Sequence, residues 1–156
     1  MGNRLCYNMP MIFVADSLDK MNTFALEFLD SLESGRRAVV VGLRGDLGSG
    51  KTTFVQNLAG HLGVEDDVTS PTYVIQKSYD LPEGRKFKKL VHIDAYRLDA
   101  AEGLAKLGFS QLLKEAGTLI VVEWPEKVPG ILPSYTKQLN FRFVNETVRE
   151  ITYGEE

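Results

Sequence analysis

The spacing of apolar residues predicts two helices in the first half of the chain. Apolar side chains recur every three or four positions after Asp16 and again after Thr53, which is the period of a helix with one buried face. Asp16 or Ser17 suits the N-cap of the first helix. Gly35 and Gly63 follow the last apolar positions, where glycine commonly ends a helix. Both helices are therefore expected to pack against a core.

Two unbroken apolar runs, residues 38–41 and 118–122, predict strands that are buried on both faces. Such runs are typical of parallel strands covered by helices on either side. Alternating polar and apolar residues predict hairpins at 73–94 and 137–153, and residues 12–14 are expected to form a short edge strand. Strands and helices therefore mix along the chain, which predicts an α/β fold.

A broken apolar stripe between the two hairpins predicts two short helices instead of one long helix. Gly103 and Gly108 interrupt the stripe, and glycine weakens a helix interior. Asp99 with Glu102 forms a possible N-terminal cap, and Gly117 is expected to end the second helix.

Composition favours an ordinary globular protein. The chain has 156 residues, of which 44% are hydrophobic and 25% charged, so we expect a single domain over residues 1–156 with residues 1–10 as a disordered lead. The net charge of −3 argues against a protein that holds nucleic acid by charge alone. Cys6 is the only cysteine, and no apolar run approaches the ~20 residues of a membrane helix. A cytoplasmic protein without membrane attachment is expected.

The segment after the first apolar run carries the clearest chemical pattern. Residues 45–52, GDLGSGKT, match the phosphate-binding pattern G-x-x-x-x-G-K-[ST]. Glycines let backbone N–H groups approach phosphate oxygens, and the following helix adds the positive end of its dipole. Lys51 is expected to reach the β- and γ-phosphates, and the Thr52 hydroxyl to ligate Mg²⁺. A strand before and a helix after support the match, so the sequence predicts a nucleoside triphosphate site.

Two carboxylates follow apolar strands. Asp94 ends the run 90–93, and Glu123 ends the run 118–122. Because acids at strand ends beside a phosphate loop commonly bind Mg²⁺ directly or through water, we expect both to converge on the metal and the attacking water. Asp94 could instead cap the next turn, and Arg97 could meet either a carboxylate or a phosphate. Trp124, the only tryptophan, favours the edge of an active site.

Two loops allow both a structural and a functional interpretation. Thr72, in the loop 69–72, is a candidate sensor of the γ-phosphate, and a plain turn stiffened by proline is the alternative. The turn of the first hairpin is either a solvated turn or a contact for an acidic partner or an RNA backbone. Its basic residues surround Phe87 and are Arg85, Lys86, Lys88 and Lys89.

Four motifs in order resemble the TsaE (YjeE) family of small bacterial ATPases over about residues 17–133. They are GDLGSGKTT (45–53), TSPTY (69–73), HIDAYR (92–97) and VEWPE (122–126). The family is implicated in the threonylcarbamoyl modification of the adenosine beside the anticodon of certain tRNAs, together with the proteins TsaB and TsaD. Ser49 stands where the family commonly has alanine, and Ala95 where a larger apolar residue is usual. Neither difference removes a donor or a ligand.

The resemblance implies a P-loop NTPase-like three-layer fold with a mixed parallel and antiparallel sheet, and it implies ATP and Mg²⁺ as cofactors. It implies that Thr52 and Glu123 ligate Mg²⁺, that Asp94 supports hydrolysis, and that Thr72 lies in a switch-like loop. Trp124 would lie at the edge of the nucleotide, and tRNA would be reached only through the complex. The residues implied to hold the triphosphate are Asp46, Leu47, Gly48, Ser49, Gly50, Lys51, Thr52 and Thr53.

Three functions share these motifs. The first is an ATPase that resets a modification complex, with slow turnover alone because no arginine finger is visible. The second is a small-molecule kinase, which needs an acceptor pocket and usually an arginine-bearing lid. After Glu123 the sequence offers only Arg142 and Arg149, both in a strand pattern of a hairpin without recognisable chemistry. The third is a nucleotide-gated binding module with little turnover.

Overall fold

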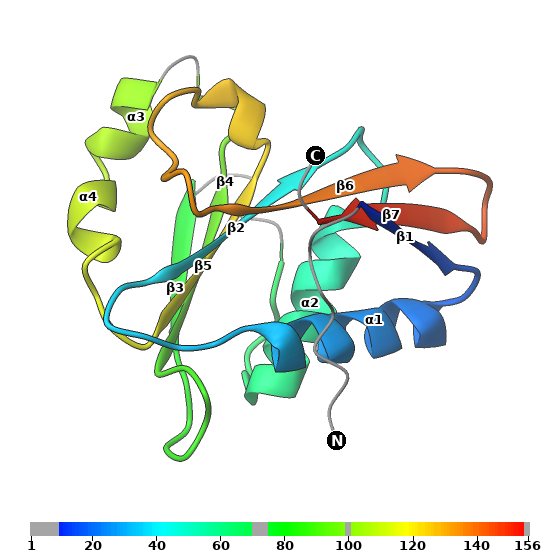
Figure 1. The fold of residues 1–156 in the computed structure, drawn as a ribbon, viewed down its shortest axis with the longest axis horizontal. Helices are drawn as coiled ribbons and strands as arrows, with labels where there is room; N and C mark the ends of the chain where they lie inside the picture. Colours follow the sequence, from blue (N-terminus) through cyan, green and yellow to red (C-terminus); the bar gives the residue numbers. More distant parts are fainter. Residues whose placement is uncertain (1–9, 70–74, 99–100, 155–156) are drawn as a thin grey trace.

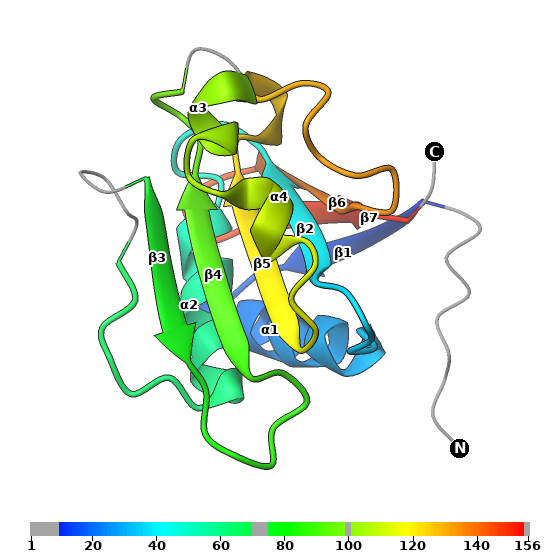
Figure 2. The same ribbon diagram turned by 90° about the vertical axis from the view of Figure 1, so that its left-hand side faces the viewer.

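The computed structural model describes residues 10–69, 75–98 and 101–154, and within them the chain forms one mixed β-sheet between two layers of helices (Figures 1 and 2). Helices α1 and α2 cover one face, and α3 and α4 cover the other. The predicted α/β class with a mixed sheet is therefore confirmed. The elements are β1 (Met11–Ala15), α1 (Leu18–Ser31), β2 (Val39–Arg44), α2 (Lys51–Leu62), β3 (Gln76–Asp80), β4 (Lys89–Asp94), α3 (Ala101–Ala105), α4 (Phe109–Leu112), β5 (Thr118–Glu123), the 3₁₀ turn η1 (Pro125–Lys127), β6 (Lys137–Phe143) and β7 (Arg149–Tyr153).

Parallel strands form the middle of the sheet, whose order is β1-β7-β6-β2-β5-β4-β3. Strands β4, β5, β2 and β6 run parallel, and the outer pairs β3–β4, β6–β7 and β1–β7 are antiparallel. Both predicted hairpins and the predicted edge strand are thus present; residues 73 and 74 of the first hairpin lie outside the described residues. The carboxyl ends of the parallel strands meet at one edge, where open α/β sheets bind ligands.

The first helix ends earlier than predicted. Ser17 is its N-cap and accepts a hydrogen bond of 3.1 Å from a first-turn amide. The helix stops at Ser31 and not at Gly35, because Leu32 turns to extended backbone (φ −79°, ψ 142°) and buries its side chain in the core. Helix α2 ends as predicted, with Gly63 in the left-handed conformation (φ 86°).

The helices on the other face are short. Helices α3 and α4 are separate, as the glycine pattern predicts, and Gly108 between them is left-handed (φ 76°). Helix α4 ends at Leu112 and not at Gly117, which is left-handed (φ 75°) in the turn before β5. The predicted cap residue Asp99 lies outside the described part of the chain. Within the described ranges, every helix is too short or too polar to span a lipid bilayer.

An aromatic cluster fixes the position of α2 against the sheet. Phe54, in the first turn of α2, is fully buried. Its ring centroid lies 5.7 Å from that of Phe24, 5.8 Å from Phe28 and 5.5 Å from Phe141. These rings come from α1 and β6, so the beginning of α2 is held between a helix and a strand. Close packing of this kind leaves α2 little freedom to shift.

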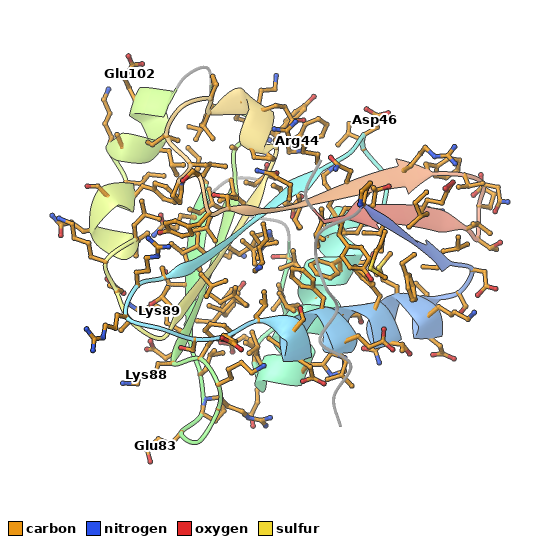
Figure 3. All side chains as sticks on the ribbon, viewed as in Figure 1. Arg44, Asp46, Glu83, Lys88, Lys89 and Glu102 are labelled. Carbon is orange, nitrogen blue, oxygen red and sulfur yellow. The ribbon has the colours of Figure 1, made fainter. Side chains whose placement is uncertain are left out.

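The basic residues of the β3–β4 turn contact the ends of other elements. The Lys86 ammonium donates hydrogen bonds to the carbonyl oxygens of Leu29 (2.9 Å) and Asp30 (3.1 Å), at the end of α1. Lys89 forms an ion pair of 2.8 Å with Glu115. Cations are favourable at helix C-termini, where carbonyl groups lack partners. This arrangement supports the structural interpretation of the basic turn, whose outer tip carries Glu83 (Figure 3).

Replacing Lys86 by alanine should therefore lower stability. We expect Lys86→Ala to reduce the free energy of unfolding by about 1 kcal/mol, because the last carbonyls of α1 lose a charged donor. Urea denaturation followed by circular dichroism measures the change. Lys88→Ala is the matched control, since exposed Lys88 donates no side-chain hydrogen bond within the described residues. Equal stability of the two variants would contradict the capping role.

Candidate functional site

The loop between β2 and α2 depends on two glycines. Gly45 has φ 142°, and a Cβ atom there would lie 2.4 Å from the carbonyl oxygen of Phe141. Gly50 has φ 102°, and a Cβ atom there would lie 3.2 Å from the Cε atom of Met21. Gly50 is also the N-cap of α2 and offers no side chain to the first turn. The amide groups at this helix end therefore need an acceptor from elsewhere, which makes the loop suitable for an anion.

Lys51 lies beneath this loop. Its side chain is almost fully buried (5% exposed), and its ammonium donates hydrogen bonds to the carbonyl oxygens of Gly45 and, at 3.0 Å, of Asp46. The ammonium nitrogen lies 4.2 Å from the centroid of the Trp124 ring. Burial lowers the pKa of Lys51 below its ordinary value, and the Glu123 carboxylate opposes this shift. The loop thus holds a positive charge that can exchange carbonyl contacts for those of an anionic ligand.

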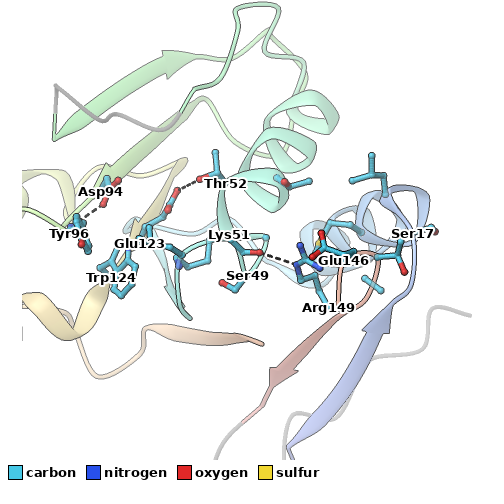
Figure 4. Close-up of a pocket in the computed structure, with 18 of the residues that line it drawn as sticks. Ser17, Ser49, Lys51, Thr52, Asp94, Tyr96, Glu123, Trp124, Glu146 and Arg149 are labelled. Atoms are coloured by element: carbon cyan, nitrogen blue, oxygen red, sulfur yellow. Dashed lines mark hydrogen bonds between the residues drawn. The ribbon is translucent and has the colours of Figure 1, made fainter. Parts of the chain in front are cut away.

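Thr52 and Glu123 meet across the gap between α2 and the end of β5 (Figure 4). The Thr52 hydroxyl donates a hydrogen bond of 3.4 Å to Oε1 of Glu123. Glu123 is only 3% exposed. It stands on the same face of β5 as Leu119 and Val121, which pack toward α1 and α2. The alternation along β5 therefore directs this carboxylate to the first turn of α2.

Asp94 lies beside Glu123 in the sheet, since the two residues are register partners at the ends of β4 and β5. Oδ1 of Asp94 accepts a hydrogen bond of 3.0 Å from the amide of Tyr96. The carboxylate therefore caps the following turn, which is the structural role that the sequence analysis allowed for Asp94. It also lines the cavity described below. The structure brings the two predicted acids together at one edge.

Trp124 has a left-handed backbone that is unusual for a large residue (φ 60°). Its amide donates to the carbonyl oxygen of Leu43 at 3.1 Å, and Pro125 begins a 3₁₀ turn directly after it. The indole ring lies 5.0 Å from the ring of Tyr96, centroid to centroid. This conformation turns the indole back over Lys51, so the sole tryptophan forms one wall of the site.

A cavity of about 1040 Å³ extends over the loop. One end is formed by the acids and aromatic residues described above, and the other by the start of α1 and the β6–β7 turn (Figure 4). Asp46 is not among the lining residues but binds Lys51 through its carbonyl oxygen, and Thr72 lies outside the described residues. The predicted residues that line the cavity are Leu47, Gly48, Ser49, Gly50, Lys51, Thr52, Thr53, Asp94, Glu123 and Trp124.

Arg149 is a cavity residue that the sequence analysis did not assign. Its Nε donates a hydrogen bond of 3.1 Å to the carbonyl oxygen of Gly48, and its Nη1 donates one of 2.6 Å to that of Asn145. The last hairpin, in which no chemistry was recognised, therefore supports the loop. The contact joins residues 101 positions apart, so no local pattern could have revealed it.

His92 is the second residue that was missed. It is completely buried in β4, and its Nε2 atom lies 2.8 Å from Oε1 of Glu123. A polar residue inside the run Leu90–Ile93 was the available signal. Buried polar groups need hydrogen-bond partners, so this position implied a polar neighbour on an adjoining strand.

The oxygen atoms of this site suit a magnesium ion bound together with a phosphate ligand. Among the described residues there is no group of three or more His, Cys, Asp or Glu side chains that could hold a metal alone. Thr52 and Glu123 supply a hydroxyl and a carboxylate side by side. Mg²⁺ is commonly bound by one or two protein oxygens, with phosphates and waters completing its octahedron. The residues therefore fit Mg²⁺ carried by a polyphosphate.

Comparison with known proteins agrees with these observations. A protein of Treponema pallidum named tRNA threonylcarbamoyladenosine biosynthesis protein TsaE is 39% identical over 113 residues, which are 72% of this chain and 79% of the relative. A protein of the same name from Borreliella burgdorferi is 37% identical over 123 residues, 79% of this chain and 84% of the relative.

The fold has a solved counterpart. The crystal structure of YdiB from Bacillus subtilis superposes with a TM-score of 0.73 at 26% identity, covering 93% of this chain and 84% of YdiB. The predicted P-loop NTPase-like fold is thus confirmed. The family model described as threonylcarbamoyl adenosine biosynthesis protein TsaE matches residues 15–151. This match includes the loop at 45–52, both strand-end acids and the supporting hairpin as far as residue 151, and the chain therefore belongs to the TsaE family.

Proposed function

We propose that the protein binds ATP with Mg²⁺, hydrolyses it to ADP and phosphate, and thereby serves the threonylcarbamoyl modification of tRNA. The observation that carries this proposal is the meeting of Lys51, Thr52 and Glu123 at the uncapped start of α2, within one cavity. Membership of the TsaE family supports the pathway. The resemblance described above suggests TsaB and TsaD as the partners, with tRNA reached through them.

Each residue has a role that follows from its place. The loop amides and Lys51 would bind the β- and γ-phosphates, and Thr52 and Glu123 would hold Mg²⁺. When bound, Mg²⁺ supplies charge neutralisation to the phosphate oxygens. Asp94 lies next to Glu123 and would orient the attacking water through its carboxylate. Positioning and charge stabilisation are the main demands of phosphoryl transfer, and these residues meet both.

The residues at the two ends of the cavity suggest how a bound nucleotide would be oriented. Lys51, Glu123 and Trp124 gather at one end, which suits the γ-phosphate. The opposite end is lined by Leu18 and Met21 of α1 and by the β6–β7 turn. The nucleoside would therefore extend from the loop toward α1, where apolar side chains are available to a base. The cavity volume of about 1040 Å³ leaves room for both parts.

The two arginines after Glu123 give no support to a small-molecule kinase. Arg149 donates a hydrogen bond to the carbonyl oxygen of Gly48 in the loop, and Arg142 forms an ion pair with Glu150 on the neighbouring strand. Neither arginine lies on a lid within the described ranges. A nucleotide-gated module with little turnover uses the same site, so the two remaining functions differ only in whether hydrolysis is needed.

Removal of the loop lysine tests the site directly. We expect Lys51→Ala to lower ATP hydrolysis at least ~100-fold, because the phosphates lose the buried ammonium group. Phosphate release measures the rate, and circular dichroism checks the fold. Lys114→Ala, on the opposite side of the sheet, is the control and should hydrolyse ATP like the unchanged protein. Unchanged hydrolysis in Lys51→Ala would remove the proposal.

The proposed metal ligand can be tested separately from nucleotide binding. We expect Glu123→Gln to raise the Mg²⁺ concentration for half-maximal hydrolysis at least ~10-fold, since an amide oxygen is a weaker ligand than a carboxylate. Calorimetry with ATP in EDTA should show that nucleotide binding without metal survives. Glu83→Gln removes an exposed carboxylate at the outer tip of the β3–β4 turn, which is not part of the cavity, and should change neither quantity. The same Mg²⁺ dependence in both variants would argue against Glu123 as a ligand.

A reconstituted modification reaction separates hydrolysis from gating. We expect purified TsaB and TsaD with this protein to modify tRNA through repeated cycles with ATP, but not with a non-hydrolysable ATP analogue, because the complex must be reset. Threonylcarbamoyladenosine measured by mass spectrometry after nuclease digestion gives the yield. Equal yields with ATP and the analogue would favour the binding module. Pull-down of the partners with and without nucleotide tests the association itself.

A further inference from the structure

We propose that His92 is a positioning residue for Glu123, holding its carboxylate beside Thr52 for the metal. The inference deepens the proposed function and rests on it. It begins from the only contact that His92 makes through a side-chain nitrogen within the described residues, which is the 2.8 Å contact from Nε2 to Oε1 of Glu123.

The burial of His92 calls for an explanation. Its side chain is completely inaccessible, and the residues around it in β4, Leu90, Val91 and Ile93, belong to the two apolar cores. An apolar residue would fill the same place without the penalty of burying a polar ring. The Nδ1 atom is buried without a hydrogen-bond partner in the described part of the chain. The hydrogen-bonding capacity that His92 uses is therefore directed entirely at Glu123.

The chemistry of the pair fixes the direction of the hydrogen bond. An ionised carboxylate can only accept, so Nε2 of His92 carries the hydrogen and its N–H donates a hydrogen bond to Oε1 of Glu123. The hydroxyl of Thr52 donates to the same oxygen at 3.4 Å. Both hydrogen bonds that the described residues give to this carboxylate end on Oε1, and Oε2 keeps its lone pairs for a cation.

The register of the sheet determines the side from which His92 approaches Glu123. His92 is the register partner of Val121, two residues before Glu123, and both stand on the face that α1 and α2 cover. The imidazole therefore reaches Glu123 from the core side and limits the rotamers of its side chain. Ligands of metals are commonly oriented in this way by a hydrogen bond from a buried neighbour, and loss of such a neighbour weakens metal affinity by roughly 10–100-fold.

Two amide variants of His92 separate positioning from simple packing. In His92→Gln the side-chain amide can replace the Nε2 donor, whereas in His92→Asn it is too short to reach Glu123. We measure by calorimetry the affinity for a non-hydrolysable ATP analogue over a series of Mg²⁺ concentrations, which reads metal binding without turnover. We expect the half-saturating Mg²⁺ concentration to rise at least ~10-fold in His92→Asn and less than ~3-fold in His92→Gln.

A packing control completes the experiment. Val121→Ala removes buried apolar atoms from the register partner of His92 and should lower stability in urea while leaving the half-saturating Mg²⁺ concentration unchanged. Equal Mg²⁺ dependence in His92→Asn, His92→Gln and the unchanged protein would overturn the positioning role alone. A rise in Val121→Ala as large as in His92→Asn would also overturn it. If the affinity of the unmodified protein for the analogue does not depend on the Mg²⁺ concentration, the proposed function is overturned as well.

Discussion

The first turn of α2 is the constraint on which the rest of the site depends. A helix that begins at a glycine has no side chain to accept its first N–H groups, so those groups and the helix dipole remain available to a ligand. This is useful only if the helix cannot move. Phe54 fixes it, because its buried ring packs against α1 and β6 immediately after the loop. The aromatic core therefore holds the start of α2, and with it the end of the loop, in a fixed position.

The parallel strands supply the second half of the site. β2 lies next to β5, and β5 next to β4, and all three run parallel. The sheet itself therefore brings their carboxyl ends together, independently of the loops that follow. The alternation of side chains then selects the face: Glu123 shares its face with Val121 and turns toward α2. A shift of one residue in the register of β5 would direct this carboxylate to the side of α3 and α4. The rigidity of the sheet, and not a flexible loop, therefore determines how near Glu123 lies to Thr52.

Local patterns predicted most of the fold and several of the residues that meet at the centre of the candidate site. Lys51 and Thr52 belong to one short motif, and Glu123 ends an apolar run, so each left a signal in neighbouring residues. Arg149 left no such signal, since it acts on Gly48 across the sheet. His92 left only the signal of a polar residue in an apolar run, which does not show that its partner is a carboxylate of another strand. The end of α1 was misplaced for the same reason. Burial of Leu32 in the core, a tertiary effect, outweighs the local preference for a stop at glycine.

Buried polar groups concentrate in this part of the molecule. Lys51, His92 and Glu123 are each at least nine-tenths inaccessible, and the left-handed Trp124 lies directly beside them. Such groups and conformations oppose folding, and the fully apolar clusters on both faces of the sheet offset them. The benefit is preorganisation. Under the proposed function, charges that are already desolvated and held by the sheet would need little rearrangement when a ligand binds. Part of the free energy that opposes folding would then lower the barriers to binding and to hydrolysis.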